Sequence, residues 1–231
     1  MNIILLGAPG AGKGTQAQKI QQKFNIPQLS TGDMLRHEIH NKTEAGKQAA
    51  KLIDDGNFVP DALILQMIES RILQNDCANG FILDGFPRNL AQCHSLKALF
   101  LKHGLAAPCV IHLKVSDSTL AHRLSGRLYA EQSKCVYHIS YNPPLIEGIC
   151  DVSGEKLVQR KDDKADVIQH RLKIYHAETA PVFEYYKTQG RVFELGAASI
   201  HAVFTQICTV CEIIQGINNP QEKTFKKTLK I

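Results

Sequence analysis

The stretch Gly7-Ala8-Pro9-Gly10-Ala11-Gly12-Lys13-Gly14-Thr15 directly follows the apolar run Ile3-Ile4-Leu5-Leu6 and opens into a helix-compatible segment. Glycines let backbone N–H groups converge on phosphate oxygens, and the positive end of the following helix points at the same place. The lysine adds a full positive charge. The stretch therefore predicts a loop that binds nucleotide phosphates, with contacts from Gly10, Ala11, Gly12, Lys13, Gly14 and Thr15.

The residue after the lysine departs from the general phosphate-binding loop. In that loop a Ser or Thr follows the Lys, and its hydroxyl binds Mg²⁺. Here the position is Gly14, and the hydroxyl comes one residue later, at Thr15. We therefore expect the metal to be held by other groups or through water.

The composition is that of an ordinary globular protein. The chain has 231 residues, of which 44% are hydrophobic and 21% charged, enough for one α/β domain with insertions. No apolar run has the length of a membrane span, and the apolar N-terminal run lacks the basic flank of a signal peptide. Seven scattered cysteines, an odd number, are typical of a reducing compartment, so we expect a cytoplasmic protein.

The positive net charge does not by itself indicate nucleic-acid binding. The chain carries a formal charge of +5, but only 6% of its residues are aromatic and no basic run is interleaved with stacking residues. A site that binds phosphates needs several arginines in any case. The one local basic run, residues 223–230, follows Pro220 and is interpreted as a solvated tail.

Hydrophobic patterns alternate between strands and helices along the chain, which predicts a parallel sheet. We expect strands near residues 2–6, 28–29, 81–84, 109–115 and 191–195, with helices between them. The fold class is α/β, with a phosphate-loop core in which helices flank a central five-stranded sheet. The core comprises residues 1–29, 60–125 and 164–217, with a helical insert at 30–59, a β-rich lid at 126–163 and a basic tail at 218–231. Within the lid, residues 136–141 are strand-like, and after the lid we expect one helix over residues 166–187.

Further motifs occur in a characteristic order: Ser30-Thr31-Gly32-Asp33, Asp84-Gly85-Phe86-Pro87-Arg88, Gly126-Arg127, Tyr141-Asn142-Pro143-Pro144 and Arg160-Lys161-Asp162-Asp163. From residue 1 to about 215 the chain resembles the nucleoside monophosphate kinases, and most closely the long-lid form of the adenylate kinases. This resemblance implies Mg²⁺-dependent transfer of the terminal phosphoryl group of ATP to AMP, giving two ADP. It also implies a role in nucleotide homeostasis and purine salvage, and a monomeric protein with ATP, AMP and ADP as its only partners.

The charged residues of the chain suit phosphoryl transfer even when the family resemblance is set aside. Phosphoryl transfer needs positive charge and alignment of two nucleotides rather than a covalent nucleophile. Arginine is well suited because its planar fork binds phosphate oxygens and stays charged. The candidate catalytic residues are Lys13, Asp84, Arg88, Arg127, Arg160 and Arg171.

Asp84 comes at the end of an apolar strand, where a parallel sheet presents carboxylates to a ligand. Given Gly14, we expect Asp84 to orient Mg²⁺ through bound water, since this ion dehydrates reluctantly. The structural alternative is an aspartate that only stabilises a turn.

The resemblance also implies two nucleotide sites. Thr31 and the amide of Gln92 favour adenine over uracil or cytosine as the acceptor base, whereas Phe58 and Leu195 depart from the family pattern. The AMP site comprises Thr31, Arg36, Asn57, Phe58, Val59, Gly85, Phe86, Pro87, Arg88, Gln92, Arg160 and Arg171. The ATP site adds Arg123, Arg127, Val136, Tyr137 and Ala198 to the phosphate loop.

Two cysteine patterns point to structure rather than chemistry. Some long-lid relatives hold zinc with four lid residues, but the matching positions here are Ala130, Ser133, Cys150 and Ser153, so we expect no zinc and a hydrogen-bonded lid. The C-x-x-C of residues 208–211 lies in an apolar helical pattern, which predicts core packing.

Three other functions stay open. A GTP:AMP phosphotransferase would differ in its phosphate donor, and a UMP/CMP kinase would differ in its acceptor. The remote alternative is a regulatory or nucleic-acid-binding protein with a phosphate loop. That alternative would require base recognition by switch segments or an extended basic face, and the sequence has neither.

Overall fold

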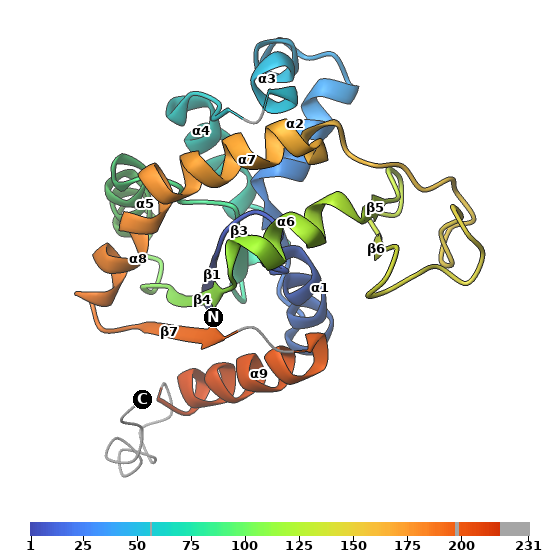
Figure 1. The fold of residues 1–231 in the computed structure, drawn as a ribbon. Coiled ribbons are helices and arrows are strands. Elements are labelled where there is room, and N and C mark those ends of the chain that lie inside the picture. The colour runs from blue at the N-terminus through green and yellow to red at the C-terminus, as the bar shows by residue number, and fades with distance from the viewer. Residues whose placement is uncertain (56, 197–198, 218–231) are drawn as a thin grey trace.

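A parallel five-stranded sheet forms the centre of the molecule (Figure 1). The computed structural model describes residues 1–55, 57–196 and 199–217. The strand order is β2-β3-β1-β4-β7, and every neighbouring pair is parallel, as expected from the alternating pattern. The strands are β1 (Asn2–Leu6), β2 (Gln28–Ser30), β3 (Phe81–Asp84), β4 (Cys109–Lys114) and β7 (Val192–Gly196).

Helices cover both faces of the sheet because its central strands are apolar on both sides. In β1, Ile4 and Leu6 pack toward α4 (Asp61–Ile72), α5 (Leu90–Lys102) and α8 (Ala180–Lys187). Ile3 and Leu5 pack toward the other face, against α1 (Lys13–Phe24), α6 (Asp117–Ser125), α7 (Ala165–Ile174) and α9 (Ile200–Ile217). Each face therefore has its own apolar core.

The helical insert consists of α2 (Thr31–His40) and α3 (Glu44–Asp54), which pack against each other at the top of Figure 1. Ser30 caps α2 by accepting a hydrogen bond from the backbone N–H of Asp33 at 3.2 Å. Gly46 lies so close to the backbone of Glu38 that no side chain fits there. Between β2 and α4 the chain thus forms a compact helical pair.

The lid projects to the right in Figure 1 and contains a two-stranded antiparallel sheet, β5 (Arg127–Tyr129) and β6 (Val136–His138). The expected strand at 136–141 ends early because Ser140 and Tyr141 donate their backbone N–H groups to Nδ1 of His138, at 3.0 and 3.1 Å, and so form a turn. Ala130, Tyr137, Cys150 and Leu157 form a small apolar core within the lid.

The segment predicted as one helix at 166–187 contains a π-helical turn, Tyr175–Thr179, between α7 and α8. Pro181, the second residue of α8, has no N–H to donate and its ring disturbs the preceding turn. Farther along, Cys208 and Cys211 of α9 are buried, and Cys211 packs in the core, as expected. None of the described helices is both long and apolar enough to cross a membrane.

Candidate active site

The phosphate loop connects β1 to α1 with three glycines of positive φ, Gly7 at 144°, Gly10 at 83° and Gly12 at 96°. Gly7 lies against β4, since a Cβ there would come within 2.8 Å of the carbonyl oxygen of Leu113. Lys13 folds back over the loop and donates to the carbonyl oxygens of Gly7 and Ala8, at 2.7 and 3.0 Å. Burial lowers the pKa of Lys13 to about 8, an effect that Asp84 opposes and Arg88 reinforces.

Asp84 lies at the carboxyl end of β3, beside the phosphate loop. Its side chain is buried, which raises its pKa, while the charge of Lys13 opposes that rise. Oδ2 accepts a hydrogen bond from Nε2 of Gln28 at 2.8 Å, and a Cβ on Gly14 would lie 3.5 Å from the same oxygen. A Cβ at position 14 would therefore reach ordinary van der Waals contact with the carboxylate, so Gly14 lies directly beside Asp84.

This donor set fits a hydrated Mg²⁺. The ion prefers oxygen ligands and keeps several of its waters, so a single carboxylate beside the phosphates is sufficient protein contact. Asp84, Gly14 and Thr15 all line the same cavity, and the small Gly14 leaves space next to Asp84. The residues thus suit an ion held through water.

The larger of two adjacent cavities has a volume of about 730 Å³ and extends from the phosphate loop to the lid. Its walls include Leu195 and Gly196 of β7, neither of which was among the predicted contacts. Ala198 lies outside the described residues. Every other predicted ATP contact lines this cavity: Gly10, Ala11, Gly12, Lys13, Gly14, Thr15, Arg123, Arg127, Val136 and Tyr137.

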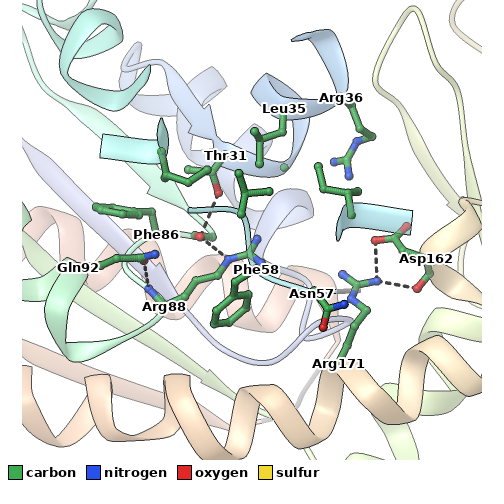
Figure 2. Close-up of a pocket in the computed structure, with 15 residues that line it drawn as sticks. Thr31, Leu35, Arg36, Asn57, Phe58, Phe86, Arg88, Gln92, Asp162 and Arg171 are labelled. Atoms are coloured by element: carbon green, nitrogen blue, oxygen red, sulfur yellow. Dashed lines mark hydrogen bonds and ion pairs between the residues drawn. The ribbon is translucent and has the colours of Figure 1, made fainter. Parts of the chain in front are cut away.

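The smaller pocket, of about 70 Å³, lies between the insert and the loop after β3 (Figure 2). Most predicted AMP contacts line it: Thr31, Arg36, Asn57, Phe58, Val59, Gly85, Phe86, Arg88, Gln92 and Arg171. Pro87 does not line it, and Arg160 lines the larger cavity instead. The structure therefore separates the predicted residues into two neighbouring sites.

Hydrogen bonds hold Arg88 in the small pocket (Figure 2). Its Nε donates to the carbonyl oxygen of Gly85 at 2.6 Å, and its backbone carbonyl accepts from Oγ1 of Thr179 at 2.8 Å. The guanidinium lies 5.3 Å from the ring centre of Phe58. Burial lowers the pKa of Arg88 to about 10, with a further contribution from Arg171, so it stays charged at neutral pH.

The two cavities meet at a group of residues that lines both: Gly32, Arg36, Gly85, Arg88 and Arg171. Three of these five are arginines. A group bound in one cavity and a group bound in the other would therefore face each other across shared positive charge, as phosphate transfer requires.

Two carboxylates in the turn at residues 161–163 form ion pairs with Arg127 of the lid and Arg171 of the core. Asp163 is 1% exposed and binds Arg127 through two hydrogen bonds, of 2.6 and 2.7 Å. Arg171 pairs with Asp162 at 2.8 Å and with Asp163 at 3.3 Å. Asp162 and Asp163 are thus paired with cations rather than solvated.

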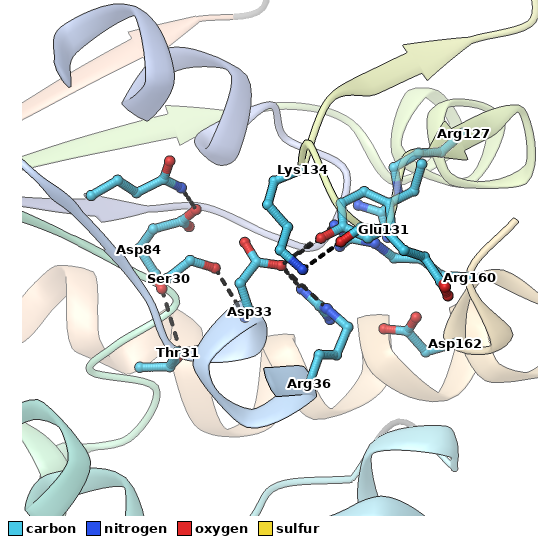
Figure 3. Close-up of polar contacts among 12 residues, drawn as sticks. Ser30, Thr31, Asp33, Arg36, Asp84, Arg127, Glu131, Lys134, Arg160 and Asp162 are labelled. Carbon is cyan, nitrogen blue, oxygen red and sulfur yellow. Dashed lines mark hydrogen bonds and ion pairs between the residues drawn. The ribbon is translucent and has the colours of Figure 1, made fainter. Parts of the chain in front are cut away.

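Arg160 is held more loosely than its neighbours (Figure 3). It lies 3.9 Å from the ring centre of Tyr129 and 3.7 Å from Oδ1 of Asp33, while Arg36 binds the same carboxylate at 3.2 Å through Nε. Among the described residues, the buried Nε of Arg160 has no hydrogen-bond partner. Burial lowers its pKa to about 10, and the charge of Arg127 adds to this effect.

Several residues of the site had no assigned role in the sequence. Gln28 and Thr179 contact the site through side-chain hydrogen bonds, and Asp33 and Tyr129 flank Arg160. Asp33 stands inside a motif that the sequence already singled out, three residues before Arg36, so helical spacing could have identified it. Thr179 is distant in sequence from every motif. The nearby Pro181 is a signal that the helix is irregular there, but it does not identify Thr179 as a contact.

Comparisons with known proteins point to one family. The family model described as adenylate kinase matches residues 5–191. A protein of Caldicellulosiruptor saccharolyticus named adenylate kinase is 45% identical over 190 residues, covering 82% of this chain and 88% of the relative. One of Lachnospira eligens with the same name is 44% identical over 211 residues, covering 91% of this chain and 99% of the relative.

Proposed function

The chain belongs to the adenylate kinase family and is an ATP:AMP phosphotransferase, and on this premise we propose which residues carry out the transfer. The observation that carries the proposal is the pair of adjacent cavities that share Arg36, Arg88 and Arg171. We assign the larger cavity to ATP and the smaller to AMP. The γ-phosphate of one nucleotide then meets the α-phosphate of the other at the shared arginines.

In this proposal the protein catalyses the transfer by supplying positive charge to the phosphates and by aligning the two nucleotides. Lys13 binds the phosphates of ATP on the loop, and Arg88 fixes the phosphate of AMP as the acceptor oxygen approaches. Arg127, Arg160 and Arg171 neutralise the charge that develops on the transferred phosphoryl group. No side chain is needed as a nucleophile, because a phosphate oxygen of AMP attacks the γ-phosphorus directly while the bond from that phosphorus to the β,γ-bridging oxygen breaks and ADP leaves.

Asp84 is the proposed residue for Mg²⁺, which it would hold through bound water. The ion, when present, neutralises phosphate charge and orients the terminal phosphates. Gly14 contributes by leaving room beside the carboxylate, and Gln28 fixes the carboxylate by donating to Oδ2.

The domain division proposed from the sequence also has structural support. The insert at 30–59 is a helical pair, and the lid at 126–163 has its own small apolar core and sheet. The lid contributes Arg127, Val136 and Tyr137 to the ATP cavity, so its closure would exclude water from the γ-phosphate. The core of residues 1–29, 60–125 and 164–217 then serves as the fixed platform.

We further propose a monomer that acts in the cytoplasm. The described residues of one chain line both cavities and include the proposed catalytic arginines, so the proposal requires no residue from a second copy. All seven cysteines are free, as expected in a reducing compartment. The absence of zinc from the lid also remains a prediction, supported by the serines at positions 133 and 153, which hydrogen-bond rather than coordinate.

The substrate assignment is tested by measuring ADP formation with Mg·ATP and each of AMP, UMP, CMP and GMP. We expect AMP to be the best acceptor by a wide margin, and ATP to be a better donor than GTP. Faster turnover of UMP or CMP would contradict the acceptor assignment, and faster turnover with GTP would contradict the donor assignment.

The residue assignment is tested by Arg88→Ala, for which we expect kcat to fall by about 10²- to 10³-fold because one positioned charge is removed from the transition state. The matched control is Arg191→Ala, an exposed arginine that lines neither cavity and should leave kcat unchanged. An Arg88→Ala protein that keeps its fold by circular dichroism and also keeps its kcat would show that the role of Arg88 is wrong.

A further inference from the structure

Gln92, the proposed reader of the acceptor base, is held by a second side chain from the start of α4. Its Nε2 donates to Oδ1 of Asp61 at 2.6 Å, and its Oε1 accepts from the backbone N–H of Arg88 at 2.6 Å. Gln92 is 3% exposed and lines the smaller pocket, whereas Asp61 does not line it. Asp61 therefore reaches the pocket through its contact with Gln92 and not by lining it.

These two contacts determine which way the amide of Gln92 is turned. A carboxylate only accepts hydrogen bonds, and a backbone N–H only donates. Turning the amide over would place its oxygen against the carboxylate of Asp61 and its NH₂ group against the N–H of Arg88. Both contacts would then be repulsive, and both buried polar groups would be left without a hydrogen-bond partner.

Asp61 is itself held in place. Nδ2 of Asn89 donates to both oxygens of Asp61, at 3.2 and 3.4 Å, and Oδ1 of Asn89 accepts from the backbone N–H of Gln92 at 2.8 Å. Asn89 is the cap of α5, so the network connects the beginnings of α4 and α5. The side chains that orient the amide of Gln92 thus belong to the beginnings of two helices and not to a long loop.

A fixed amide can distinguish bases that a free amide cannot. After these two hydrogen bonds, Gln92 retains one N–H donor and one oxygen lone pair for a ligand. Adenine offers a 6-amino donor beside a ring-nitrogen acceptor, which matches that pair. A 6-oxo purine offers an acceptor at position 6 and, in hypoxanthine, an N1–H donor, so it requires the amide turned over.

We infer that Asp61 is a positioning residue that makes the acceptor site selective for 6-amino over 6-oxo purine nucleotides by holding the amide of Gln92 in one orientation. This inference rests on the proposed role of the smaller pocket as the AMP site. It adds a residue outside that pocket to the determinants of base choice.

The experiment measures kcat and KM for AMP and for IMP in the wild type and in Asp61→Asn. IMP differs from AMP only in the groups at positions 6 and 1 of the base. An amide at position 61 can accept from Gln92 or donate to it, so it no longer prescribes one orientation. We expect the ratio of kcat/KM for IMP to that for AMP to rise about tenfold, mainly through KM, as the release of one repulsive contact predicts.

The matched control is Asp117→Asn, which removes a carboxylate from the first residue of α6, as Asp61 is the first residue of α4. Asp117 is 55% exposed at its side chain and lines neither cavity, so the ratio should not change. A purely structural role of Asp61 would reduce activity toward both acceptors equally and leave the ratio at its wild-type value, which would overturn the inference.

If Asp61→Asn does not fold, Asp61→Ser replaces it, because a hydroxyl can accept a hydrogen bond from Gln92 or donate one to it and so prescribes no orientation of the amide. With Gln92 intact, the preference for AMP over IMP should again fall about tenfold. An unchanged preference would again overturn the inference. Failure of the wild type to make ADP from ATP and AMP would instead contradict the proposed function.

Discussion

Lys13 has two properties that determine its charge in the empty site. It is held by the carbonyl oxygens of Gly7 and Ala8, and burial lowers its pKa to about 8, well below the ordinary value of a lysine. Carbonyl oxygens stabilise an ammonium group only partly, so the phosphates of ATP are the natural counter-charge. The charge of Lys13 in the empty site should therefore depend on pH near the physiological range.

We expect kcat/KM for ATP to decrease as the pH rises above about 8, because Lys13 loses its proton in the free enzyme and with it the attraction for phosphate. Bound phosphates favour the charged form, so kcat should stay flat to a higher pH than kcat/KM. The measurement is a set of initial rates from pH 6.5 to 10. Arg88, with a pKa of about 10, would contribute a second decrease only at the upper end of this range.

Lys13→Arg provides the comparison, since its guanidinium stays charged throughout. Its rates will be lower, but the decrease in kcat/KM near pH 8 should disappear. Lys23→Ala, on the exposed end of the same helix, should keep the wild-type profile. A decrease near pH 8 that persists in Lys13→Arg would assign it to another group.

At the scale of elements, the sequence predicted those parts of the site that depend on local pattern. The five strands, the phosphate loop and the helix that begins at Lys13 follow from apolar runs and glycine spacing. The contacts of Thr179 with Arg88 and of Asp61 with Gln92 join positions 91 and 31 residues apart. No periodicity encodes such pairs, because they depend on how helices pack after the elements have formed.

In the lid, too, local sequence patterns predict the boundaries of the segment but not its side-chain contacts. Its boundaries were predicted from the change in pattern after Gly126, but its strand ends at His138 because that imidazole accepts two backbone N–H groups. The hydrogen-bonded interior was expected, yet its central acceptor, Glu155, was not among the predicted residues. Glu155 accepts from the backbone N–H groups of Gln132 and Ser133, both at 2.8 Å, and from Oγ of Ser153 at 2.8 Å.

Glu155 makes the stability of the lid dependent on acid pH. The backbone donors of Gln132 and Ser133 lower its pKa from 4.5 to about 2. A carboxyl group with a depressed pKa stabilises the folded lid fully above the unfolded value of 4.5, and this contribution is lost as the pH falls through about 2. We expect the amide proton resonances of Gln132 and Ser133 to shift with an apparent pKa near 2.

Glu155→Gln tests the same element at neutral pH. Its side-chain amide has one oxygen, so it cannot accept as many hydrogen bonds as the carboxylate, and we expect faster proteolytic cleavage within residues 126–163. Glu147→Gln, an exposed lid residue, serves as the control and should be cleaved at the wild-type rate. Equal cleavage of the two variants would show that Glu155 does not organise the lid.

At the scale of the whole molecule, the lid, the insert and the core meet around excess positive charge. The lid contacts the insert through the ion pair of Lys161 with Asp54 at 2.8 Å and the core through Gln18, which donates to the carbonyl oxygen of Lys134 at 3.3 Å. Around the cavities, cationic side chains outnumber carboxylates. Bound phosphates would remove this imbalance, so closure and nucleotide binding should stabilise each other.

Arg160 is the best residue at which to measure this coupling between closure and nucleotide binding. Its buried Nε has no hydrogen-bond partner among the described residues, and its nearest carboxylate, that of Asp33, lies 3.7 Å away. In Arg160→Ala, the loss of the contact with Tyr129 is offset by the removal of an incompletely paired buried charge. We expect the free energy of unfolding without ligand to change by less than about 1 kcal/mol. Ligands at about 100 times Kd stabilise the wild type by about 2.7 kcal/mol, or roughly 5–10 °C in Tm.

That ligand-induced increase in Tm, measured by calorimetry with ATP and AMP at fixed concentrations, should be clearly smaller in Arg160→Ala than in the wild type, since the phosphates lose a partner and Kd rises. Lys161→Ala is the adjacent control: its ion pair with Asp54 is exposed to solvent and Lys161 lines neither cavity, so the ligand-induced increase should equal that of the wild type. The opposite pattern, a marked loss of unliganded stability in Arg160→Ala with a full ligand-induced increase, would mean that Arg160 stabilises the fold and does not bind phosphate. Because ligand-free and ligand-bound transitions are recorded on the same protein, the two roles are separated without reference to the catalytic rate.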